Sequence, residues 1–388
     1  MLQRILLIVS LCASFLLSAP AICQKTPVDK TKPAPQTILT YDVEFVPDPR
    51  LSVPFQETGY PAIFAQGCDS HGNPYVQVNR ILPPNSVQVL KFDPDGLVTF
   101  ETNKITDVVE PKWVSDFISD SELYLLVEGD TRTEQKTKKT DDGKDEVYWD
   151  KTGEPKYYIA QFDSDGSYKG AIKLDLPFVP KKLSGFKSGN FLAAGLDAQH
   201  VPHVALLDAR GQWLRDIDFP KEKQEAAEKT SERALGTTAP PDFASMILSE
   251  LTSFFPYQGN VLYVRGRTGA PIYEVRAGGD ASPVKIKAPD GYSVEYLLPS
   301  DRNWFVVSTE QGKFTGAKSR IYEVNPSTGE VIARYLAEGA GQAKSITEGE
   351  SDLACFHEGE FVSVRHQDGK LTVLHGTPTV ARPNQKPQ

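Results

Sequence analysis

The stretch CDSHGNPYV (residues 68–76), followed by VQVLKFDPDG (residues 87–96), contains the pattern that decides the fold. Apolar and polar residues alternate in both halves, which is typical of a strand with one buried face. Both halves also place glycine close to aspartate or asparagine. These residue types tolerate positive φ or hydrogen-bond their own backbone in tight turns. The stretch therefore predicts short strands joined by tight turns.

The first half of this pattern recurs along the chain. Clear copies of glycine–asparagine before a strand stand at Gly72-Asn73, Gly189-Asn190 and Gly259-Asn260, and weaker copies at Ser121-Glu122, Arg302-Asn303 and Gly359-Glu360. An Asp/Asn/Gly turn follows each of the first five copies, as at Asp163–Gly166 and Asp208–Gly211. Once two insertions are set aside, the period is roughly 40–50 residues with four strands per unit, as a β-propeller blade requires. The sequence therefore predicts an all-β, six-bladed β-propeller.

Residues 68–96 resemble one repeat of the six-bladed NHL-type propellers, and the other copies resemble it faintly. That family includes binding scaffolds, lactone hydrolases and lyases. The resemblance implies blade architecture and leaves the activity open, because one fold supports many functions.

Composition limits the class of protein. The chain has 388 residues, of which 39% are hydrophobic and 24% charged, as in an ordinary globular protein. Its net charge of −9 argues against nucleic acid as a partner, since such binding needs clustered lysine and arginine.

The N-terminus has the order of a secretory signal: Arg4, an apolar run over residues 5–17, then small residues up to Ala21. We expect residues 1–21 to be cleaved and the protein to be secreted or periplasmic, with no transmembrane span in the mature chain. Cys23 leaves a lipoprotein as an alternative. Residues 22–36 resemble a tether, and residues 377–388 are expected to be a disordered tail.

The propeller is expected over residues 37–376, with insertions at 129–156 and 220–250. The first insertion is highly charged and predicts a solvated hairpin. The second predicts a short helical insertion, with one charged helix over 221–235 and a further helix after Pro241.

The last blade is one strand short, and residues 37–46 alternate well enough to supply the missing strand. Pairing the first strand with the last blade would close the ring and protect two sheet edges. A competing phase takes residues 366–369 as the last turn of the blade and leaves the N-terminal strand as an extra.

Once Cys12 is removed with the signal, and with Cys23 beside the cleavage region, Cys68 and Cys355 remain in the folded body. The first and last blades are neighbours in a closed ring, so we expect a disulfide between these two residues. Free buried thiols are one alternative. A zinc site with His71 and His357 is another, because two cysteines and two histidines form a zinc-compatible set.

The sequence contains none of the common linear motifs for hydrolases, phosphate or dinucleotide binding, or haem attachment. We therefore expect a non-catalytic binding or scaffold module with no cofactor, which takes a protein or small-molecule ligand on one propeller face. The alternative is a metal-assisted lactone hydrolase or lyase. Its ion would be held by carboxylates near the starts of inner strands: Asp116, Glu250, Glu295 and Asp352.

Overall fold

The computed structural model describes residues 38–55, 61–80, 86–140, 144–219, 252–265, 272–284, 286–287, 292–298, 300, 303–310, 320–337, 346 and 350–381. All of them belong to the unit Ile38–Gln388. The expected signal peptide, the tether and the helical insertion at 220–250 lie outside the described residues. The described part contains one short 3₁₀ turn, η1 (Thr102–Lys104), and is otherwise built from strands and turns.

Three of the propeller sheets each use four strands in simple chain order. Their strands are β2 (Pro61–Cys68), β3 (Pro74–Arg80), β4 (Ser86–Asp93) and β5 (Gly96–Glu101); β12 (Val179–Gly185), β13 (Phe191–Leu196), β14 (Pro202–Leu207) and β15 (Trp213–Asp216); and β16 (Thr252–Tyr257), β17 (Asn260–Arg265), β18 (Ile272–Val275) and β19 (Ala281–Val284).

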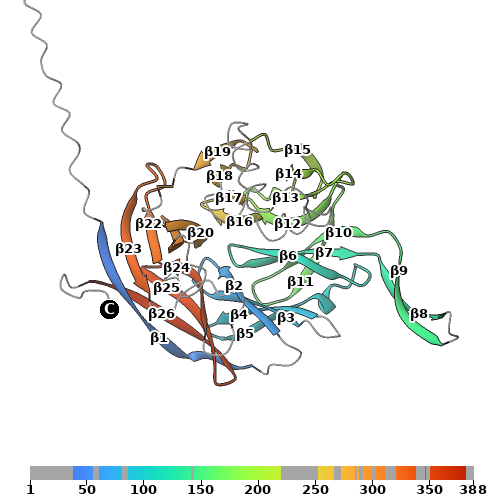
Figure 1. The fold of residues 1–388 in the computed structure, drawn as a ribbon, viewed down its shortest axis with the longest axis horizontal. Coiled ribbons are helices and arrows are strands. Elements are labelled where there is room, and N and C mark those ends of the chain that lie inside the picture. Colours follow the sequence, from blue (N-terminus) through green and yellow to red (C-terminus); the bar gives the residue numbers. More distant parts are fainter. Residues whose placement is uncertain are drawn as a thin grey trace, which may run out of the picture. The chain divides into compact units, whose positions relative to one another are not determined.

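A fourth sheet is interrupted by the first insertion. It contains β6 (Lys112–Ser119), β7 (Glu122–Gly129), β10 (Lys156–Phe162) and β11 (Tyr168–Lys173). Between β7 and β10, strands β8 (Arg132–Lys139) and β9 (Asp145–Thr152) pair only with each other as a separate two-stranded ribbon. The charged insertion therefore forms a hairpin that projects from this sheet (Figure 1).

The remaining strands form one eight-stranded sheet in the order β20-β21-β22-β23-β1-β26-β25-β24. Their bounds are β20 (Tyr292–Leu298), β21 (Trp304–Glu310), β22 (Arg320–Val324), β23 (Val331–Ala337), β24 (Ser351–His357), β25 (Glu360–Gln367), β26 (Lys370–Val380) and β1 (Leu39–Pro54).

This large sheet corrects the expected blade count. We predicted six separate four-stranded sheets, and the structure has five propeller sheets. The reason is that β1 pairs antiparallel with β26 and also in parallel with β23, which joins the last eight strands. The antiparallel ladder from Tyr41–Val380 onwards confirms that the N-terminal strand completes the last four-stranded unit, and it rules out the competing phase. Strand β26 also extends to Val380, so residues 377–380 of the expected tail are paired with β1.

The sheets form a β-propeller in which the first strand of each unit lies innermost (Figure 1). Around the ring, β2 contacts β6 and β24, β12 contacts β6 and β16, and β20 contacts β24. Clusters of buried side chains fill the spaces between successive four-stranded units. Burial between blades, rather than within a single sheet, is therefore the main source of cohesion.

Tight turns explain the recurring Asp, Asn and Gly residues. Asp368 and Gly369, which join β25 to β26, have φ of 52° and 65°. Positive φ at both central positions matches the right-handed twist of the strands, and glycine adopts it without steric cost. In longer turns the Asp69 carboxylate accepts the backbone N–H groups of His71 and Asn73 at 2.9 and 3.0 Å.

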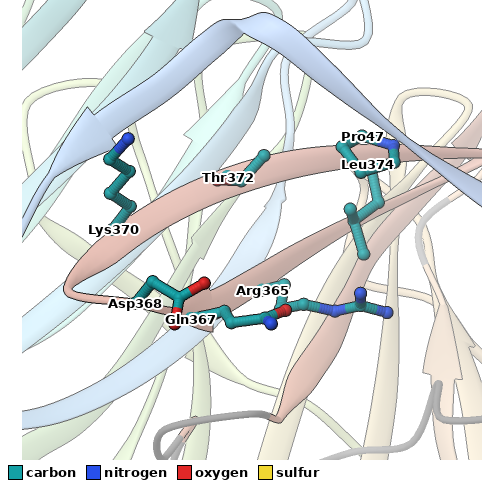
Figure 2. Close-up of a pocket in the computed structure, with 7 residues that line it drawn as sticks. All are labelled: Pro47, Arg365, Gln367, Asp368, Lys370, Thr372 and Leu374. Carbon is teal, nitrogen blue, oxygen red and sulfur yellow. The ribbon is translucent and has the colours of Figure 1, made fainter.

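The ladder between β1 and β26 has one irregularity. Pro47 pairs with Leu374 and Ser52 pairs with Thr372, so residues 48–51 stand opposite a single residue of β26. An open concavity lies beside this bulge, on the hairpin formed by β25 and β26 (Figure 2).

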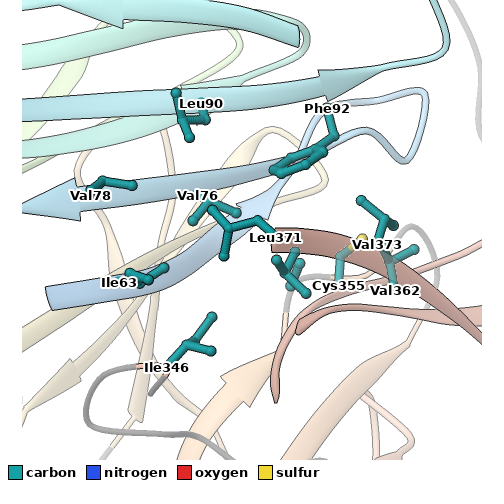
Figure 3. Packing of buried hydrophobic residues seen from close by; sticks show 12 residues of the cluster. Ile63, Val76, Val78, Leu90, Phe92, Ile346, Cys355, Val362, Leu371 and Val373 are labelled. Carbon is teal, nitrogen blue, oxygen red and sulfur yellow. The ribbon is translucent and has the colours of Figure 1, made fainter. Parts of the chain in front are cut away.

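The junction between the last and first units contains an apolar cluster that includes Ile63, Val76, Phe92 and Val373 (Figure 3). Cys355 belongs to this cluster, and Cys68 packs against it. The predicted disulfide Cys68–Cys355 is present, with the two Cα atoms 5.8 Å apart. It links residues 287 positions apart and bridges β2 to β24, so the ring is closed by a covalent bond as well as by β1.

Candidate functional site

The inner strands share an irregularity close to the ring axis. Five of the six carry a register shift against their second strand. The shifts lie between Ala65 and Gly67, Trp113 and Ser115, Pro180 and Lys182, Val294 and Tyr296, and Leu353 and Cys355. A β-bulge bends a strand and re-aims the side chains that follow it, which is why bulges are frequent next to functional sites.

Asp116 follows the bulge of β6 by two residues. The residue keeps some exposed surface, but its Oδ2 atom is shielded from solvent and has no hydrogen-bond partner. Burial raises the pKa of this carboxyl to about 6, although the positive charge of Lys182 and the Trp113 indole act in the opposite direction. Asp116 is therefore a carboxyl that can change protonation state near neutral pH.

Lys182 directly follows the bulge of β12, on the neighbouring inner strand. Burial lowers the pKa of its ammonium group, and the negative charge of Asp116 raises it by a smaller amount. The two groups interact through their charges, but no ion pair or hydrogen bond joins Lys182 to any residue in the described ranges. Asp116 and Lys182 therefore form a charge pair of opposite sign without direct contact.

Other polar groups on β6 and β12 also lack partners. Ser115 and Ser184 are 4% and 0% exposed, and neither Oγ atom is hydrogen-bonded to a residue that the structure describes. The Trp113 Nε1 atom is likewise buried without a partner at hydrogen-bonding geometry. Buried polar atoms are normally satisfied, so this concentration on two adjacent strands distinguishes this part of the ring.

Asp352, another candidate of the carboxylate ring, has a structural contact. Its Oδ2 accepts the Ala65 backbone N–H at 3.1 Å, across the junction between β24 and β2. The Ser363 hydroxyl donates to the Asp352 backbone oxygen at 2.8 Å. Asp352 therefore helps to close the ring at the same junction as the disulfide.

Glu250 and Glu295 are the other two candidates of the carboxylate ring. Glu250 lies outside the described residues, and Glu295 lies at the bulge of β20 where the structure describes the backbone alone. Within the described ranges, no three His, Cys, Asp or Glu side chains are grouped to hold a metal ion.

The zinc set proposed from the cysteines and histidines is not formed, because the two sulfur atoms are joined to each other. His357 packs over the turn at Gly72, where a Cβ atom would lie 2.5 Å from the ring atom Cδ2. Gly72 also has a φ of 81°, so glycine is required there on two counts. His71 is exposed on the same turn.

Two charge clusters were not predicted from the sequence. Lys91, with a side chain 4% exposed, lies 3.4 Å from Asp69 and 2.9 Å from Asp93, and it donates to the Ser164 backbone oxygen of the next sheet. On β14, His203 lies between Asp216 (2.8 Å) and Asp197 (3.3 Å) and stacks on Phe178. Both clusters are satisfied within the fold, which indicates a structural role.

Two comparisons found no match: no family model matches the chain, and no curated protein matches it. Solved structures show distant likenesses. The GH74 xyloglucanase from Xanthomonas campestris aligns with 81% of this chain and 43% of its own, at 12% identity and a TM-score of 0.38. The GH43 BlXynB protein from Bacillus licheniformis aligns with 73% of this chain and 55% of its own, at 11% identity and a TM-score of 0.31.

An uncharacterized protein from Listeria monocytogenes aligns with 83% of this chain and 82% of its own, at 9% identity and a TM-score of 0.36. The chain spans about half the length of the two glycoside hydrolases that it matches. At these identities and TM-scores, the likenesses carry no argument about activity. No helix in the described part of the chain is both long and apolar enough to cross a membrane.

Proposed function

We propose that this chain is an extracytoplasmic β-propeller that binds a small polar ligand at the inner strands β6 and β12, without catalysing a reaction. One observation carries the proposal: Asp116 and Lys182 influence each other's pKa, yet Asp116 Oδ2 and the Lys182 ammonium group have no hydrogen-bond or ion-pair partner among the described residues. Leaving a buried acceptor such as Asp116 Oδ2 unsatisfied costs about 1–3 kcal/mol. A ligand that supplies the missing hydrogen bonds would recover this cost.

The chemistry of the site defines the ligand. Asp116 needs a hydrogen-bond donor, whereas Lys182 and the Trp113 indole each need an acceptor. Because the two charges have opposite sign, the site favours a ligand without net charge. A polyhydroxylated molecule or a zwitterion carries both kinds of group within a few ångströms.

The proposal includes six blades of the NHL-like kind. The eight-stranded sheet would then be two four-stranded blades, with β1 as the outer strand of the last blade and an added contact to β23. The apolar cluster around Phe305, Tyr335 and Phe361, which joins the two halves of this sheet, supports this division because clusters of the same kind separate the other sheets.

The extracytoplasmic location rests on the expected signal peptide at residues 1–21 together with the Cys68–Cys355 disulfide. Disulfides persist in oxidising compartments and are rare in the cytosol. N-terminal sequencing of exported protein tests this part, since an intact Met1 or a lipid on Cys23 would contradict it.

The alternative function, metal-assisted hydrolysis or elimination, is supported by one observation: a carboxyl with a pKa of about 6 suits general acid or base catalysis. Against it, Asp352 already accepts a backbone hydrogen bond at the ring junction. Elemental analysis of the mature protein separates the two functions, because one tightly bound calcium or zinc ion per chain would favour the enzyme.

Thermal shift with D-glucose and glycine as probes tests the binding proposal. We expect one of them to raise the Tm of the wild-type protein, and Asp116→Asn and Lys182→Met to abolish the effect. Asp95→Asn, which changes an exposed carboxylate, serves as the matched control and should leave the shift unchanged. Equal shifts in the wild type and the Asp116→Asn variant, or no shift with either probe, would contradict the proposal.

A further inference from the structure

The concavity beside the β1 bulge contains an arginine whose guanidinium group has no partner in the described part of the chain. It is lined by Pro47, Arg365, Gln367, Asp368, Lys370, Thr372 and Leu374 (Figure 2). Arg365 is half-buried, and no hydrogen bond or ion pair links its guanidinium group to another residue of the described ranges. A guanidinium group offers a planar set of five donors that matches an oxyanion, so an unpaired one in a concavity suggests an anion site.

The register places a second donor beside Arg365. Arg365 pairs with Thr372 across β25 and β26, and Thr372 pairs with Ser52 of β1, so the three side chains share one face of the sheet. The Ser52 and Thr372 hydroxyl oxygens lie 2.9 Å apart. That hydrogen bond uses one of the two hydroxyl hydrogens, and the other remains available to a bound oxyanion.

The concavity has a net positive charge, because the acidic groups near it are neutralised or outnumbered by basic ones. Asp48, in the bulge itself, is bound by the Arg50 side chain at 3.1 and 2.8 Å, and this hydrogen bonding lowers the pKa of Asp48 to about 2. Arg50 therefore neutralises Asp48. Of the lining residues, Arg365 and Lys370 carry positive charge and Asp368 carries negative charge. Leu374, only 1% exposed, and Pro47 add an apolar wall.

We propose that this concavity binds the oxyanion group of a small ligand, a carboxylate or a phosphate, with Arg365 as the main anchor and Lys370 as a weaker electrostatic contact. The site is independent of the inner strands β6 and β12, so it does not rest on the function proposed above.

NMR of the arginine Nε–Hε groups tests this proposal directly, with sodium acetate and inorganic phosphate as probes. The Arg365 signal is assigned by its absence from the spectrum of Arg365→Lys. We expect the Arg365 signal to shift on addition of the probe and the shift to saturate at millimolar probe concentration. Sodium chloride at equal ionic strength should produce no saturable shift. The probe with the lower apparent Kd identifies the source of the oxyanion. Arg210, which is exposed and paired with Asp208, is the internal reference in every spectrum.

Two variants complete the test. Arg365→Gln should abolish saturable binding, followed through backbone amide shifts of β25 and β26, and Lys370→Gln should weaken it roughly two- to five-fold, as expected for an exposed charge. Asp95→Asn, at an exposed carboxylate outside both proposed sites, should leave acetate and phosphate binding unchanged. A linear response to both probes, an equal response to chloride, or an equal shift at Arg210 would overturn the proposal. The titration of the wild-type protein decides the result, so a variant that fails to fold would not leave the proposal untested.

Discussion

At the scale of single residues, the raised pKa of Asp116 predicts a particular pH dependence of stability. Its folded-state pKa of about 6 lies above the ordinary value of 3.8, so the folded protein binds this proton more tightly than the unfolded chain does. Ionisation of Asp116 therefore destabilises the fold above pH 6, by about 3 kcal/mol at most, and the penalty disappears as pH falls below the unfolded pKa.

Asp116→Asn removes the charge and keeps the shape. We expect the variant to be more stable than the wild type at pH 7.5 and of equal stability at pH 3, as measured by urea unfolding at both values. The exposed control Asp95→Asn should show no such pH-dependent difference from the wild type. A difference between Asp116→Asn and the wild type that is the same at both pH values would contradict the assignment.

His203 should act with the opposite sign. Burial lowers its pKa, but Asp216 and Asp197 together raise it further, so the net pKa is above the ordinary value. The charged ring stabilises the fold below the unfolded pKa, and this contribution is lost as pH rises through the folded pKa. The Tm deficit of His203→Gln should thus be larger at pH 5.5 than at pH 8.5. Partial exposure limits the effect to about 1 kcal/mol.

At the scale of elements, strand β1 should be essential for stability because it pairs with two other strands, β23 and β26. Val43, 7% exposed, packs in the cluster with Phe305 and Tyr335, whereas Leu39 on the same strand is 53% exposed. We expect Val43→Ser to lower the free energy of unfolding by about 2–3 kcal/mol and Leu39→Ser by less than about 0.5 kcal/mol. Similar losses in the two variants, measured by urea unfolding, would show that β1 adds pairing without burial.

The ribbon formed by β8 and β9 should be dispensable for stability. Its ladder runs from Arg132–Thr152 to Lys139–Asp145, and neither strand pairs with any other sheet in the described structure. Replacing residues 132–152 with a short Gly-Asn linker should change the Tm by less than about 2 °C, because the excised segment buries little of the propeller. A large fall in Tm by differential scanning calorimetry would indicate an unrecognised contact.

At the scale of the whole molecule, the disulfide should be the strongest single constraint on the ring. The simple loop model gives roughly 4–5 kcal/mol for a loop of 287 residues, an upper value because residual structure in the unfolded chain reduces it. We expect reductant to lower the urea midpoint of the wild type strongly and to leave the double variant Cys68→Ala/Cys355→Ala unaffected. Equal midpoints for the oxidised wild type and the double variant would refute a stabilising role.

Much of the architecture could be predicted from the sequence because it depends on local patterns. The turns around Asp69 and Gly369 follow from residue type, and ring closure follows from counting the strands of the last unit. The parallel pairing of Leu39 with Ala333 could not be predicted, since an edge-to-edge contact between blades leaves no periodic signal.

The candidate site was predicted less well, because it depends on contacts between different strands that leave no local pattern in the sequence. Asp116 was named from its place near an inner strand, but its coupling to Lys182 depends on two bulges on different strands. The dipeptide Lys181-Lys182, which spans the bulge of β12, was the available signal. Asp352 was named for the same reason as Asp116, and its contact with the Ala65 backbone arises only when the ring closes.

The pairing of β1 with β26 also sets an order of events during synthesis. Ser52 is synthesised 320 residues before Thr372, so the hydrogen bond between the two side chains can form only when almost the whole chain has been made. Until then, the edge of β1 that faces β26 has no partner to hold it in register, although Cys68 and Ala65 can already reach Cys355 and Asp352, which are synthesised earlier. Pairings this distant in sequence are intrinsically slow and leave unpaired edges open to aggregation. The C-terminal strand therefore completes the last unit at the very end of synthesis: in a chain truncated before Lys370, β1 would lack its antiparallel partner even though the Cys68–Cys355 bridge could still join β2 to β24.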